Sequence, residues 1–304
     1  MNIRNGSSVD FLQSELKNFQ EIAKKIKPSS GDIPKIPGIE LYGEVIPFNG
    51  IVGGDHVIYV DFNKRYDLDH RIQVANNQNR PDIAEKLQLN KRRAGVLLAD
   101  AAGHNITDAL LTAMLHQAFL TGVQYELYHY GEVTTGLFEI LNTRFFNSSS
   151  VTKFLTLIYG EIWDNGNFRF LSAGHPLPVV FSNKYEKMIK VCHDRIVSFP
   201  PIGTMPSGED IDSRMLFSLL GYKKRYSINV IDLMGWGDIL LLYSDGFSEH
   251  ANEREIDYFP DRVETLLKQI KNESASDIYF KLKEDLLAFA APADDITFVV
   301  IKKV

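Results

Sequence analysis

Short apolar runs alternate with turn residues along most of the chain, which is typical of a protein built on β-sheets. Buried strands are predicted at residues 96–99, 239–243 and 296–301, because each is a short, almost unbroken apolar run. Two more strand-like runs, 152–163 and 167–172, flank Asp164-Asn165-Gly166. An Asn-Gly pair between two strands predicts a hairpin. Apolar residues at helical spacing predict helices at 105–122, 133–146, 261–270 and 275–290.

The first 36 residues are predicted to form an N-terminal helix and linker, ahead of a main body at 37–304. An amphipathic helix is expected at 9–27, and its apolar side carries Phe11, Leu12, Leu16, Phe19, Ala23 and Ile26. Prolines and a glycine between residues 28 and 37 then end the helical pattern. Two roles stay open for this helix: packing on its own domain, or acting as a regulatory or dimerisation element.

The composition is that of a soluble globular protein rather than of a nucleic-acid-binding or membrane protein. With 304 residues and 44% apolar content, the chain can bury a substantial core. Its net charge of −6 (33 basic minus 39 acidic residues) does not favour a nucleic-acid partner. No apolar run approaches the roughly 18–20 residues of a membrane span, and no secretion signal is recognised at the start. The single cysteine fits a reducing compartment, so a cytoplasmic location is expected.

Four short motifs each place an aspartate beside a predicted strand or a glycine. They are Gly53-Gly54-Asp55, the run ADAAGH at 99–104, Tyr243-Ser244-Asp245-Gly246 and Asp294-Asp295-Ile296-Thr297. Taken singly, each is most simply a turn. Together they suggest carboxylates held at strand ends, which would repel one another unless a cation lay between them. Oxygen ligands without a cysteine cluster favour Mg²⁺ or Mn²⁺ over zinc, and two such ions can activate water for attack on phosphorus.

The order of these motifs resembles a known family. GGD, ADAAGH, SAGHPLP (172–178), LLLYSDGFSEH (240–250) and DDITFVVI (294–301) are similar to the metal-dependent PPM protein phosphatases. The nearest branch is the bacterial SpoIIE type, which includes the RsbU stress-response phosphatases, and the resemblance extends roughly over 37–304. It implies an α+β fold: a layered α-β-β-α sandwich of two central, mainly antiparallel sheets flanked by helices.

The resemblance also implies a site and a reaction. Asp55, Asp100 with the carbonyl of Ala101, Asp245 and Asp294 match the ligands of two Mn²⁺ or Mg²⁺ ions, and Asp295 would lie just behind them. These aspartates would act catalytically through metal-bound water, which attacks phosphoserine or phosphothreonine without a covalent intermediate. The implied substrate is a phosphoprotein, typically an anti-sigma-factor antagonist of the STAS type in a bacterial partner-switching pathway. An activator protein or a homodimer formed through the N-terminal helix could regulate it.

Three features depart from the family pattern. Asn105 follows His104 where a glycine is usual, and it can cap the helix that begins there. The segment at about 61–93 is longer than the usual connection, so it is either a flap emerging near Asp55 or a solvated insertion with a short helix at 83–89. No single arginine is identified as the one that binds phosphate. The candidates are Arg65, Arg71, Arg92, Arg93 and Arg144.

Two other functional classes stay open. A catalytically silent scaffold of the same fold would need none of the four acids, and their presence argues against it. A hydrolase of small phosphorylated metabolites would keep all of them, and its specificity would lie in surface loops such as 61–93 and 192–225.

Overall fold

The computed structural model describes residues 10–11, 14–15, 17–18, 21–22, 25–26, 32–48, 53–103, 106–148, 153–189, 195–210, 212, 215–232 and 234–304. The predictions made for His104, Asn105 and the single cysteine, and for part of the helix at 9–27, therefore lie outside the described residues. The residues described between 10 and 22 are helical, and Phe11 and Ile22 there are exposed. No helix in the described part of the chain is both long enough and apolar enough to cross a membrane.

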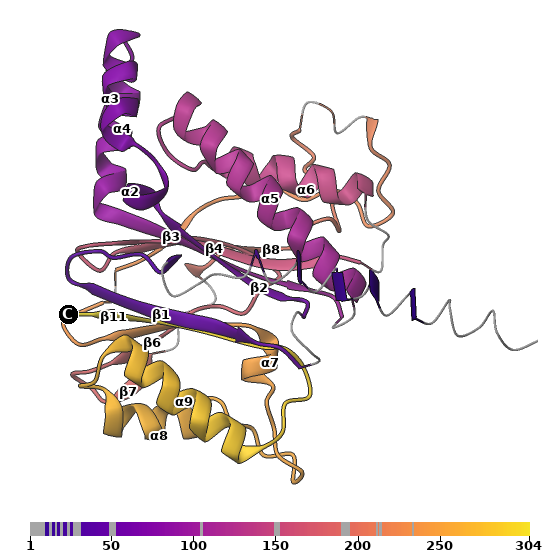
Figure 1. The fold of residues 1–304 in the computed structure, drawn as a ribbon, viewed down its shortest axis with the longest axis vertical. Helices are drawn as coiled ribbons and strands as arrows, with labels where there is room; N and C mark the ends of the chain where they lie inside the picture. Colours follow the sequence, from indigo (N-terminus) through magenta and orange to yellow (C-terminus); the bar gives the residue numbers. More distant parts are fainter. Residues whose placement is uncertain are drawn as a thin grey trace, which may run out of the picture.

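Two β-sheets form the centre of the molecule (Figure 1). The first is antiparallel throughout and has the order β1 (Ile39–Ile46), β11 (Ile296–Lys303), β10 (Ile239–Tyr243), β6 (Val179–Ser182) and β7 (Lys187–Ile189). The second has the order β2 (Asp55–Asp61), β3 (Arg93–Ala101), β4 (Leu155–Trp163), β5 (Phe168–Ala173) and β8 (Ser198–Phe199), and β9 (Asn229–Ile231) also pairs with β5. Only the β5–β8 pair in these two sheets is parallel among the described residues.

Helices cover the outer faces of both sheets (Figure 1). On one side lie α5 (Ile106–His129) and α6 (Thr135–Ser148), and on the other α8 (Asp261–Ile270) and α9 (Ala275–Phe289). A further short helix, α7 (Asp245–Ser248), directly follows β10. This arrangement confirms the predicted α-β-β-α sandwich.

The buried side chains form three apolar layers, one between the sheets and one under each helical cover. Strand β3 shows how the sequence builds them: Leu97 and Ala99 face the layer under α5, whereas Val96 and Leu98 face the other sheet. Because successive side chains in a strand point to opposite faces, a strand buried on both sides must be apolar at nearly every position. This is why β3 and β10 are continuous apolar runs.

The predicted hairpin between β4 and β5 is confirmed. The Trp163 N–H donates to the carbonyl of Asn167 at 3.0 Å, and Gly166 takes the left-handed conformation at φ 89°. The predicted helix at 105–122 is too short, because α5 continues through Gly122 to His129. A Cβ at position 122 would lie 2.2 Å from Cδ1 of Leu137, so this glycine allows α6 to approach α5 closely and does not end the helix.

The long connection after β2 is helical, and it lies at the end of β2 opposite Asp55. It contains α2 (Phe62–Arg65), α3 (Leu68–Asn77), α4 (Pro81–Leu89) and the 3₁₀ turn Asn90–Arg92, of which only a helix at 83–89 was expected. The expectation that it emerges close to Asp55 is wrong. Asp55 pairs with Asp100 whereas Asp61 pairs with Ala94, and six strand residues span about 20 Å. Figure 1 shows α3 and α4 standing away from the sheets at that end.

Candidate active site

Asp55 and Asp100 face each other across neighbouring strands. They are register partners at the ends of β2 and β3, and Asp55 is only 4% exposed. The Ser244 hydroxyl donates to Oδ2 of Asp55 at 2.7 Å and accepts a hydrogen bond from the Thr297 N–H at 3.0 Å. Ser244 and Thr297 belong to the other sheet's strands or their ends. The Asp55 carboxylate therefore joins the two sheets at this edge.

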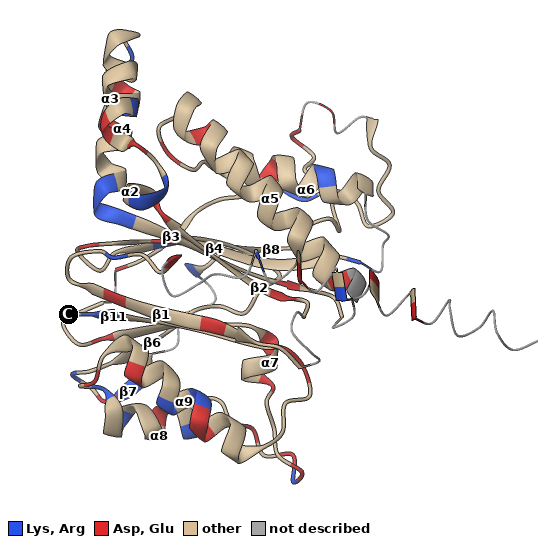
Figure 2. Cartoon of the chain, in the orientation of Figure 1, with Lys and Arg blue, Asp and Glu red and all other residues tan. Residues whose placement is uncertain are grey.

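Asp245 and Asp294 reach the same edge from the other sheet. Asp245 is the first residue of α7, immediately after β10, and Asp294 lies two residues before β11. Both are close enough to Asp100 to raise its pKa electrostatically. Acidic positions (red in Figure 2) accordingly occur around α7 and at the strand ends beside it. The structure thus brings the four sequence-predicted acids together from positions far apart in the chain.

Three carboxyl groups of this cluster have raised pKa values. Burial, and then repulsion from Asp245 and Asp294, raises the pKa of Asp100 to about 8. Burial and the charge of Asp100 raise the pKa of Asp55 well above its usual range, against the hydrogen bonds from Ser244 and Thr297. The pKa of Asp245 is raised mainly by burial. Charged carboxylates in this position need a compensating cation.

Asp295 holds the Gly53-Gly54 turn against the site. Its Oδ1 accepts from the Phe48 N–H at 2.7 Å, and its Oδ2 accepts from the Gly54 N–H at 2.6 Å. A Cβ on Gly54 would lie 2.3 Å from the carbonyl oxygen of Gly103 and 3.0 Å from that of Ala101. Glycine is therefore required here, because only it lets the turn pack directly on the loop that follows β3.

Lys153 connects the loop that follows β3 to the start of α5. Its ammonium forms an ion pair with Asp108, a fully buried residue in the first turn of α5, and also donates to the carbonyl of Ala102 at 3.4 Å. An acidic residue in the first turn contributes a favourable charge to the start of a helix. The burial of Asp108 against Lys153 also ties α5 to the loop beside Ala101.

His175 is a residue of this edge to which the sequence reasoning gave no role. It is buried, and its Nδ1 lies 2.9 Å from the Thr156 hydroxyl. Thr156 is the partner of Asp100 on β4, so His175 approaches the acids through one intervening side chain. Burial lowers the pKa of His175 to about 3, which keeps the ring neutral. In the sequence, His175 belongs to the SAGHPLP motif, which could have marked it as a residue of the site.

The arginine candidates for phosphate binding make their described contacts elsewhere. Arg92 pairs with Asp164, and Arg93 pairs with Glu161 inside the sheet. Arg65 pairs with Asp32. Arg71 lies over the ring of Tyr66, and Arg144 is exposed on α6. Across the part of the chain that the structure describes, none of the five has a recorded contact with the four acids.

The chemistry of the cluster fits a hard divalent cation. Its donors are carboxylate and carbonyl oxygens, which Mg²⁺ and Mn²⁺ prefer. Burial and then mutual repulsion raise the pKa values of Asp55 and Asp100, and a bound cation would relieve both effects. Among the described residues, no group of three or more His, Cys, Asp or Glu side chains is arranged closely enough to hold a metal ion. The residues therefore supply oxygen ligands and negative charge, but not a complete set of ligands around one point.

A family model matches most of this chain. The family model described as Stage II sporulation protein E (SpoIIE) matches residues 90–304. The chain belongs to the SpoIIE family. A related sequence is the phosphoserine phosphatase RsbP of Bacillus subtilis (strain 168), which is 28% identical over 160 residues. That match covers 52% of this SpoIIE-family chain and 38% of RsbP, so the chain spans well under half the length of this relative.

Solved structures share the fold of this SpoIIE-family chain. The SiaA-PP2C domain of Pseudomonas aeruginosa superposes with a TM-score of 0.61 at 14% identity, and 99% of each chain is covered. A structure of the PP2C phosphatase domain with a fragment of the regulatory domain of SpoIIE from Bacillus subtilis gives a TM-score of 0.59 at 16% identity, covering 88% of this chain and 64% of that one. At such identities the likeness establishes the fold.

Proposed function

We propose that the protein is a metal-dependent phosphoserine/phosphothreonine protein phosphatase. The observation that carries this proposal is the meeting of Asp55 and Asp100 from one sheet with Asp245 and Asp294 from the other. Membership of the SpoIIE family supports it, as does the likeness to a relative named as a phosphoserine phosphatase.

In this proposal the four aspartates and the carbonyl of Ala101 would hold two Mn²⁺ or Mg²⁺ ions. Such ions would supply an activated water and compensate the charge of the phosphate. The surrounding residues keep these ligands in place. Ser244 and Thr297 fix the orientation of the Asp55 carboxylate. Asp295 fixes the Gly54 turn, and Lys153 fixes the loop at Ala102.

A protein substrate is favoured by an exposed apolar loop between β8 and β9. Met215, Phe217 and Leu219 are 85%, 81% and 82% exposed there. The segment starts beside the active-site edge, because Ile202 bridges to Leu155, which pairs with Ala101. Apolar side chains gathered on a surface suit contact with another protein. We propose a phosphorylated anti-sigma-factor antagonist of the STAS type as that substrate, and cytoplasmic signalling as the setting.

The first experiment is hydrolysis of para-nitrophenyl phosphate with Mn²⁺, with Mg²⁺ or with EDTA. Metal-dependent hydrolysis that disappears in Asp245→Asn is the expected result. Hydrolysis that persists in EDTA, or in the variant, would contradict the proposed site. Metal binding without hydrolysis of any phosphoprotein would favour the scaffold alternative.

A second comparison separates a protein phosphatase from a hydrolase of small phosphates. A phosphorylated STAS-type protein should be turned over faster than a phosphopeptide of the same sequence, because only the folded protein can also contact the apolar loop. Faster turnover of a small phosphorylated metabolite than of either would contradict the protein substrate. An activator protein and dimerisation through the N-terminal helix stay predictions.

A further inference from the structure

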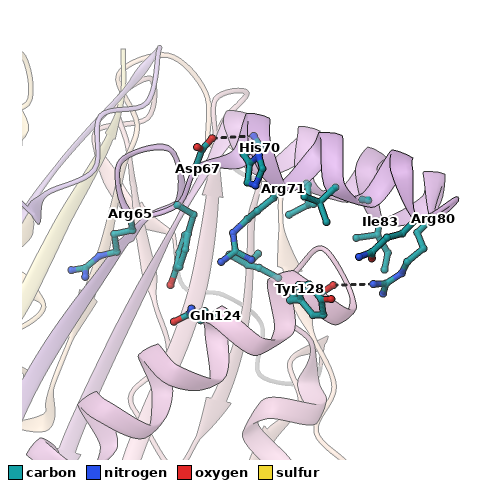
Figure 3. Close-up of a pocket in the computed structure, with 14 residues that line it drawn as sticks. Arg65, Asp67, His70, Arg71, Arg80, Ile83, Gln124 and Tyr128 are labelled. Carbon is teal, nitrogen blue, oxygen red and sulfur yellow. Dashed lines mark hydrogen bonds between the residues drawn. The ribbon is translucent and has the colours of Figure 1, made fainter.

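A cavity lies well away from the four acids, between the helices of the connection after β2 and the last turns of α5 (Figure 3). Its volume is about 460 Å³, which is within the range of small-molecule sites. Its floor is apolar and buried, and consists of Ala75, Ile83, Leu87 and Leu127. We call it the hairpin pocket, since α3 and α4 form one of its walls and α5 forms the other.

Arg71 is a charged side chain that faces this pocket, and its guanidinium has neither an acidic partner nor a carbonyl partner among the described residues. It is half-buried on α3, and its guanidinium lies 5.4 Å from the centre of the Tyr66 ring. Figure 3 shows the side chain directed between α3 and α5. Among the residues that the structure describes, no carboxylate forms an ion pair with it. A guanidinium held in this way keeps its five donors available for an anion.

The charged side chains of Arg65, Arg80 and Asp67, which also line the pocket, already bond to other groups of the protein. Arg65 forms an ion pair with Asp32 at 3.7 Å. Arg80 donates to the carbonyls of Tyr128 and His129 at 3.3 and 2.6 Å, and so attaches the insertion to the end of α5. The carboxylate of Asp67 caps α3 by accepting from the His70 N–H at 3.0 Å. The pocket thus keeps a net positive lining in a chain whose net charge is −6.

We propose that the hairpin pocket binds a small organic anion, with its apolar or aromatic body on Ile83, Leu87 and Leu127 and its acidic group on Arg71. An apolar floor alone would accept a neutral molecule, but the unpaired guanidinium makes an anionic one more favourable. The pocket is not the substrate site, because the length of β2 separates the insertion from Asp55. The ligand would contact the last turns of α5 at Leu127 and Tyr128.

The test uses two fluorescent probes of similar shape on the full chain: anionic 8-anilinonaphthalene-1-sulfonate and neutral N-phenyl-1-naphthylamine. The sulfonate should bind at one saturable site. Arg71→Met should weaken it at least tenfold and leave the neutral probe within about twofold, since the variant keeps the apolar contacts and loses the charge. Arg144→Met, which removes an exposed arginine on α6, should change neither affinity.

A second variant locates the site. Val74 lines the pocket, so Val74→Trp should fill the cavity and abolish binding of both probes. Unchanged sulfonate affinity in Arg71→Met and Val74→Trp would overturn the proposal and place the dye elsewhere, for example on the loop at Phe217. Absence of saturable binding to the unaltered protein would overturn it as well. If Val74→Trp does not fold, the contrast between the two probes in Arg71→Met decides the question.

Discussion

Asp294 and Asp295 are neighbours in sequence, yet their carboxylates have different surroundings. Asp294 is exposed and close enough to Asp100 to affect its pKa. Asp295 is 3% exposed, and both its oxygens accept backbone hydrogen bonds. We infer that the first is suited to bind an ion and that the second keeps the Gly53-Gly54 turn in position.

Asp295→Asn should lower the free energy of unfolding by about 1–3 kcal/mol, because the amide nitrogen replaces one acceptor and leaves a backbone N–H buried without a partner. Asp294→Asn is the matched control and should stay within about 0.5 kcal/mol of the unaltered protein. Urea denaturation in EDTA measures both. Equal losses in the two variants would contradict the distinction between these residues.

Asp100 should make the metal-free protein less stable as pH rises. Its pKa in the folded state is raised to about 8, so the folded protein binds this proton more tightly than the unfolded chain does. The resulting stabilisation is complete below the unfolded pKa near 4 and is lost as pH rises to about 8, by up to about 1.4 kcal/mol per pH unit.

Urea unfolding in EDTA at pH 5, 6, 7 and 8 would measure that slope. Asp100→Asn cannot titrate and should reduce the slope, whereas the raised pKa values of Asp55 and Asp245 should leave part of it. A variant that keeps the slope of the unaltered protein would show that Asp100 is not its source.

At the scale of the elements, the sequence predicted the long helices and the strands β3, β4, β5, β10 and β11, but it misjudged the end of α5 and missed α3. Gly122 was taken as the end of a helix, because its role depends on contact with Leu137 of α6, which no local pattern contains. Helix α3 was missed because only Leu68 and Ala75 in it are buried, too few to give a helical period. The ordered motifs predicted the four acids, whereas the hydrogen bonds of Asp295 depend on tertiary contacts with Phe48 and Gly54.

Gly122→Ala should destabilise the protein by about 1–3 kcal/mol, since the added carbon would press on the buried Leu137 side chain. Gly136→Ala in α6 is the comparison: its added carbon would lie 3.1 Å from the hydroxyl of Thr134 and should be tolerated. Thermal unfolding of both variants tests this. Equal melting temperatures would mean that α5 and α6 can separate freely at this crossing.

At the scale of the whole molecule, a bound cation should stabilise the fold, because the unfolded chain does not hold the four acids together. Mn²⁺ at about 100 times its dissociation constant would add about 2.7 kcal/mol and raise the melting temperature by several degrees. Asp245→Asn should remove most of that rise. A full shift in the variant would mean that the ion binds elsewhere on the protein.

The position of β11 sets an order of events during synthesis. This strand lies between β1 and β10, and Asp294 lies two residues before it, although β1 is made more than two hundred residues earlier. Until β11 leaves the ribosome, β1 has no neighbour in its own sheet and Asp55 cannot meet Asp294. If the proposed site is correct, a nascent chain that has completed the whole of the other sheet still lacks Asp294, and we expect activity only after Asp294 has been translated and β11 has paired with β1 and β10.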